Sequence, residues 1–72
     1  MPGIYDSDGT SYHFDQDKCR IIFEGMKVTF LLKPEFAHRN RPTKMILDYA
    51  TKDFYEEFDD GYSCVNKFVG MI

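Results

Sequence analysis

The stretch "CRIIFEGMKVTFLLK" (residues 19–33) decides the fold class of this chain. Its second half alternates apolar and polar side chains with a period of two, as a strand with one buried face does. Residues 20–23 are rich in β-branched and aromatic side chains, and Glu24-Gly25 marks a turn, so a second strand precedes the first. The sequence predicts an antiparallel pair whose inner face carries Met26, Val28, Phe30 and Leu32.

A second hairpin is predicted nearer the start of the chain, where Asp8-Gly9 offers the residues of a two-residue turn. Such a turn places Tyr5 opposite Tyr12 and puts Tyr5, Tyr12 and Phe14 on one face of the pleat. These aromatic side chains form either the core of a small sheet or a surface on which a ligand stacks. The sequence leaves both interpretations open.

Residues 43–58 fit two periods. The first half alternates as a strand does, whereas a stripe at helical spacing is formed by Ile46, Leu47, Ala50, Phe54 and Phe58. We expect a strand to about Tyr49 and then a short helix from Thr51 to Phe58.

The predicted fold class is therefore α+β and rich in β-structure. It is a small twisted antiparallel sheet, or an incomplete OB-like barrel, with one C-terminal helical segment. The alternative is a four-stranded sheet packed by a helix over residues 44–58. With 72 residues, 43% of them hydrophobic, the chain predicts one domain with a β-rich body (1–50) and an acidic-aromatic segment (51–72).

The net charge of −3 is distributed unevenly. Residues 1–47 carry seven Lys/Arg and six Asp/Glu, whereas residues 48–60 carry six acids and a single lysine. Acidic and aromatic side chains together can dock on a basic protein, because charge steers the encounter and aromatics anchor it. The candidate protein-binding residues are Asp53, Tyr55, Glu56, Glu57, Asp59 and Asp60. The plainer alternative is a solvated acidic face.

Three short motifs resemble the cold-shock domain, an OB-type barrel whose aromatic side chains stack single-stranded RNA or DNA. The first two are Gly3-Ile4-Tyr5 and Ser11-Tyr12-His13-Phe14. The third consists of Gly25, Val28 and Phe30. The resemblance covers residues 3–50 and implies that Tyr5, Tyr12 and Phe14 stack bases. A basic cluster beside these motifs could bind phosphates and consists of Lys33, Arg39, Arg41 and Lys44.

No arrangement typical of catalysis, of a cofactor or of a metal site occurs in the sequence, and we expect no enzyme. His13 and His38 are the only histidines, and Cys19 and Cys64 are expected to be thiols that form no disulfide. No signal peptide or membrane span is predicted, which favours the cytoplasm. We expect a small non-catalytic protein-interaction module of inhibitor or adaptor type. A single-stranded nucleic-acid-binding protein of the OB or cold-shock type is the alternative.

Overall fold

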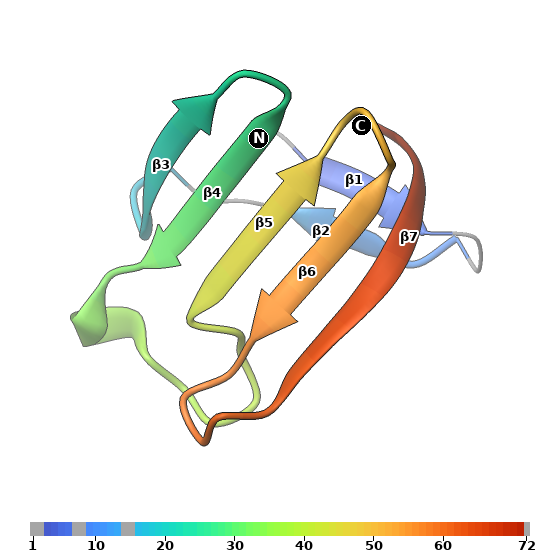
Figure 1. Cartoon of the computed structure of the whole chain (residues 1–72). Coiled ribbons are helices and arrows are strands. Elements are labelled where there is room, and N and C mark those ends of the chain that lie inside the picture. Colours follow the sequence, from blue (N-terminus) through green and yellow to red (C-terminus); the bar gives the residue numbers. More distant parts are fainter. Residues whose placement is uncertain (1–2, 7–8, 14–15, 72) are drawn as a thin grey trace.

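The computed structural model describes residues 3–6, 9–13 and 16–71, and these residues form one antiparallel sheet (Figure 1). The strands are β1 (Gly3–Asp6), β2 (Ser11–His13), β3 (Cys19–Glu24), β4 (Lys27–Leu32), β5 (Lys44–Asp48), β6 (Asp53–Glu57) and β7 (Ser63–Met71). A short 3-10 helix, η1 (Pro34–Phe36), follows β4. The order across the sheet is β2-β1-β7-β6-β5-β4-β3.

The sheet curls because β7 belongs to two parts of it. The first half of β7 pairs with β6, and its second half pairs with β1, with an irregularity between Tyr5 and Asp6. The hairpin β1–β2 thereby lies behind β5 and β6 (Figure 1). We call the side of the sheet that faces this hairpin the inner face and the opposite side the outer face. The curled antiparallel sheet is compatible with an OB-like architecture.

The core lies between the hairpin and the inner face. Phe54 and Ile4 are completely buried, and Leu47 is 1% exposed. Tyr12 of β2 meets the ring of Phe54 edge-on, with 5.0 Å between the ring centroids. Among the residues that the structure describes, the buried hydrophobic side chains are Ile4, Cys19, Val28, Phe30, Met45, Leu47, Phe54 and Phe68.

The predicted hairpin around Gly25 is confirmed. Gly25 has a φ of +61° and begins the two-residue connection between β3 and β4, a position where glycine avoids the steric cost of a Cβ. Val28 and Phe30 are buried and Leu32 packs against the core, as the alternation predicts. The prediction is wrong for Met26, which lies in the turn itself and is 58% exposed.

The predicted helical segment is wrong, and with it the α+β fold class and the alternative helix over residues 44–58. The strand to about Tyr49 is confirmed as β5, but residues 53–57 form β6 and pair with β5 and β7. A turn separates the two strands. The carboxylate of Asp48 accepts hydrogen bonds from the backbone N–H groups of Ala50 and Thr51, and Lys52 has a φ of +65°. This side-chain bonding competes with the helix that the spacing suggested.

The predicted register of the first hairpin is also wrong by one residue. Tyr12 pairs with Ile4, and Tyr5 pairs with Ser11. A shift of one residue moves side chains to the opposite face, so Tyr12 faces the core while Tyr5 lies on the other side of the hairpin. Asp8 and Phe14 lie outside the described residues.

Phe30→Ala should lower the free energy of unfolding by about 3–5 kcal/mol, because it removes a buried ring and leaves a cavity. Chemical denaturation followed by circular dichroism measures this change. Phe23→Ala is the matched control, since Phe23 is 76% exposed on a neighbouring strand and should lose less than about 1 kcal/mol. Equal losses for the two variants would contradict the burial of Phe30 in the core.

Candidate functional site

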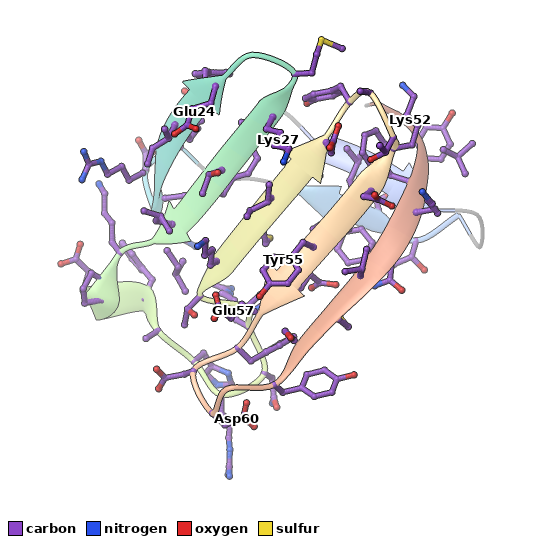
Figure 2. All side chains as sticks on the ribbon, in the orientation of Figure 1. Glu24, Lys27, Lys52, Tyr55, Glu57 and Asp60 are labelled. Atoms are coloured by element: carbon purple, nitrogen blue, oxygen red, sulfur yellow. The ribbon has the colours of Figure 1, made fainter. Side chains whose placement is uncertain are left out.

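The outer face of the sheet is the surface that Figure 2 presents to the viewer, with Tyr55 near its centre. Directly paired residues of neighbouring strands share a face, so the registers define a single row of side chains across five strands. This central row consists of Ile22, Thr29, Ile46, Tyr55 and Val65. Four of the five are half-buried by their neighbours, whereas Val65 is 59% exposed.

Charged side chains border the central row on both sides. One bordering row contains Glu24, Lys27, Asp48, Asp53 and Lys67, and the other contains Arg20, Leu31, Lys44, Glu57 and Ser63. Four acids and four bases therefore border a row that is apolar except for the hydroxyl groups of Thr29 and Tyr55. An apolar centre with a charged border is the usual anatomy of a surface that binds another protein.

The structure brings together only part of the predicted acidic-aromatic set. Asp53, Tyr55 and Glu57 alternate along β6 and share the outer face. Glu56 lies between them in sequence and points to the inner face instead. Asp59 and Asp60 follow β6 in the loop to β7 and are exposed. The six residues are therefore divided among three places.

Asp53 is engaged within its own chain. Its carboxylate forms an ion pair with Lys67 on β7, with 2.6 Å between Nζ and Oδ1, and it accepts a hydrogen bond from the Thr51 hydroxyl at 2.8 Å. The hydrogen bond from Lys67 is the main reason that the pKa of Asp53 is lowered from its ordinary value. This carboxylate thus fastens β6 to β7, besides bordering Tyr55.

Glu56 is a charged side chain that the inner face buries. It is 9% exposed and stands in one cross-strand row with Met45 of β5 and Cys64 of β7. Burial disfavours the charged carboxylate and raises the pKa of Glu56, while a hydrogen bond from Asn66 acts in the opposite direction. A carboxyl group in this position costs stability when it is ionised.

Glu56→Gln should therefore change how stability depends on pH. A raised folded-state pKa means that the contribution of Glu56 is fully present below pH 4.5, its ordinary pKa, and is lost as pH rises through the folded value. The melting temperatures of the wild type and the variant should be similar near pH 4, and the variant should be the more stable at pH 7. Glu57→Gln, which removes the same charge on the outer face, is the control. If the wild type gained stability over Glu56→Gln as pH rises, the buried position of Glu56 would be contradicted.

Asp59 and Asp60 lie beside the basic connection between η1 and β5. Together with Ala37, His38, Arg39 and Asn40 they line an open hollow at one end of the sheet. The acidic loop and part of the basic cluster are thus neighbours in the fold. Each offsets the charge of the other, which weakens either as an isolated binding surface.

The predicted nucleic-acid residues do not form one platform. Tyr5 and Tyr12 lie on opposite sides of the hairpin, and the Tyr12 ring packs on Phe54. The ammonium group of Lys33 donates a hydrogen bond to the carbonyl oxygen of Asp17. Arg39 and Arg41 are exposed in the loop after η1, while Lys44 lies on β5 opposite Glu57. Phe14 lies outside the described residues.

Within the described part of the chain, no group of three or more His, Cys, Asp or Glu side chains is placed to hold a metal ion. Both cysteines are thiols, as expected; Cys19 is buried and Cys64 is half-buried. In the same residues, no helix has both the length and the apolar character that crossing a membrane requires. No family model matches the chain, and no curated protein or solved structure matches it either.

Sequence reasoning missed most of the central row. Ile22, Ile46 and Val65 each lie one position from a side chain on the inner face, so their apolar character looked like part of the core. The signal that could have found them is apolar side chains on both faces of successive strands. A strand that is apolar on both faces is typical either of a sheet covered on both sides or of a surface that binds a partner.

Proposed function

We propose that this protein is a non-catalytic protein-interaction module of adaptor or inhibitor type, which binds a basic protein partner through the outer face around Tyr55. The observation that carries the proposal is the position of Tyr55. It stands in the central row between Ile46 and Val65, and Asp53 and Glu57 flank it along β6.

Tyr55 is suited to anchor such a contact. Tyrosine is enriched among the residues that contribute most to protein interfaces, because a large apolar ring carries a polar hydroxyl. Its neighbours already half-bury the side chain, so less conformational entropy is lost on binding than for an unconstrained side chain. Ile46 and Val65 extend the apolar contact to both sides.

The charge of the chain supports a basic partner. The net charge is −3, and Glu57, Asp59 and Asp60 gather at and beyond the end of β6. The negative potential of these carboxylates increases the rate at which a basic protein encounters this end of the outer face. The positive charges of Arg39 and Lys44 offset part of this potential, so the central row supplies most of the affinity. We place this activity in the cytoplasm, where the thiols Cys19 and Cys64 stay reduced.

The proposal is tested by placing a photo-crosslinking amino acid at Val65, identifying the captured protein, and titrating that protein in purified form against variants. Tyr55→Ala should weaken binding by about tenfold or more, mainly through faster dissociation. Glu57→Lys should slow association, and this effect should shrink as salt is added. Surface plasmon resonance separates the two rates.

Tyr62→Ala is the matched control, because Tyr62 is 61% exposed but belongs to the loop after β6. It should leave both rates unchanged, and melting curves should show that all three variants fold. Binding that is unaffected by Tyr55→Ala would overturn the proposal. So would tight binding of single-stranded oligonucleotides that depends on Lys33 and Arg39, measured by fluorescence anisotropy.

A further inference from the structure

Strand β3 is the last strand of the sheet at one end of the order (Figure 1). It runs for six residues, Cys19–Glu24, whereas β2 at the other end has only three. An edge strand presents unpaired N–H and C=O groups to any further strand. Natural edges are usually protected by bulges, prolines or short length, and the described ladder of β3 is regular throughout.

The hydrogen-bond pattern shows which backbone groups of β3 face outward. A two-residue connection makes Glu24 and Lys27 the bonded pair next to the turn, and bonded pairs then recur at every second residue. The N–H of Lys33 donates to the carbonyl oxygen of Lys18. Lys18 is reached from Glu24 in steps of two residues, so this bond fits the pattern. The N–H and C=O groups of Ile21 and Phe23 therefore point away from the sheet.

The side chains of β3 also remain open to a partner. Phe23 is 76% exposed, although it stands on the inner face in the same row as the buried residues Val28 and Leu47. On the outer face, Arg20 and Glu24 are exposed on either side of Ile22. An added strand would cover Phe23 from the side that the chain itself leaves open.

We propose that two copies of this chain pair antiparallel through β3, about a two-fold axis at Ile22. The segment Arg20-Ile21-Ile22-Phe23-Glu24 is complementary to itself when reversed. Arg20 of each copy then faces Glu24 of the other, the two Ile22 side chains face each other, and Ile21 faces Phe23. The backbone groups of Ile21 and Phe23 exchange hydrogen bonds in both directions.

Charge selects this arrangement over its competitors. A parallel pairing in register would place Arg20 beside Arg20 and Glu24 beside Glu24, and like charges directly opposite each other are unfavourable. An antiparallel pairing centred on Ile21 would set Arg20 against Ile22 and lose the direct ion pairs. In a two-fold contact both copies use the same strand, so the assembly is complete with two copies and does not continue into a filament.

Pairing through β3 would join the two sheets into one and make the central row continuous across the axis. Ile22 ends the central row in each copy, so the two rows would meet where the Ile22 side chains face each other. This inference rests on β3 alone and does not require that another protein binds the outer face.

Sedimentation equilibrium on the whole chain, from low to high micromolar concentration, tests the proposal. The mass should rise from that of the 8.5 kDa monomer to twice that value. Arg20→Glu and Glu24→Arg should each weaken dimerisation by about tenfold or more at low salt, because two attractive pairs become repulsive. The double variant, Arg20→Glu with Glu24→Arg, should restore it. Arg39→Glu makes the same charge change in a loop outside β3 and should have no effect.

Phe23→Pro provides a second test that does not depend on charge. Proline removes the outward N–H at an edge position where no bond to β4 is lost, so the monomer should fold, as melting curves check, and dimerisation should disappear. A chain that stays monomeric throughout the concentration range would overturn the proposal. A dimer that persists in both Arg20→Glu and Phe23→Pro would also overturn it, since another surface would then hold the copies together.

Discussion

The burial of Phe54 is the constraint on which the rest of this structure depends. Its ring is completely enclosed, Tyr12 of the hairpin meets it edge-on, and Leu47 of β5 lies beside it as its cross-strand partner. The contact with Tyr12 joins the beginning of the chain to its central strands. A chain of 72 residues has a thin core, so a few large side chains supply much of the apolar area that offsets the entropy of folding.

The same constraint determines what the surface looks like. Successive side chains of a strand point to opposite faces, so a buried Phe54 requires that Tyr55 lies on the outer face and that Glu56 points inward. Tyr55 thereby joins Ile46 and Val65 in the central row, whereas Glu56 is left in an apolar environment that raises its pKa. The candidate interface and the buried carboxyl are thus two consequences of one strand orientation.

The strand pair around Gly25 could be predicted from the sequence because Val28 and Phe30 alternate with polar residues and one turn residue fixes the connection. Strand β6 could not be predicted in this way. Its inner face includes the acid Glu56 and its outer face includes the aromatic Tyr55, so apolar and polar side chains do not alternate along it. The prediction for the first hairpin was wrong for another reason. The composition of the turn alone did not define the register, and a shift of one residue places Tyr5 and Tyr12 on opposite faces. The candidate site was found only at Tyr55 and its acidic neighbours, because a row across five strands depends on registers between distant segments.

Nuclear Overhauser contacts of the Phe54 ring test the central claim most directly. The account predicts contacts between the ring protons of Phe54 and Tyr12, whose centroids are 5.0 Å apart, together with cross-strand contacts between β5 and β6. Tyr5, on the opposite side of the hairpin, should show no contact with Phe54. Helical contacts between residues three apart over 51–58, without a contact between Phe54 and Tyr12, would contradict the account.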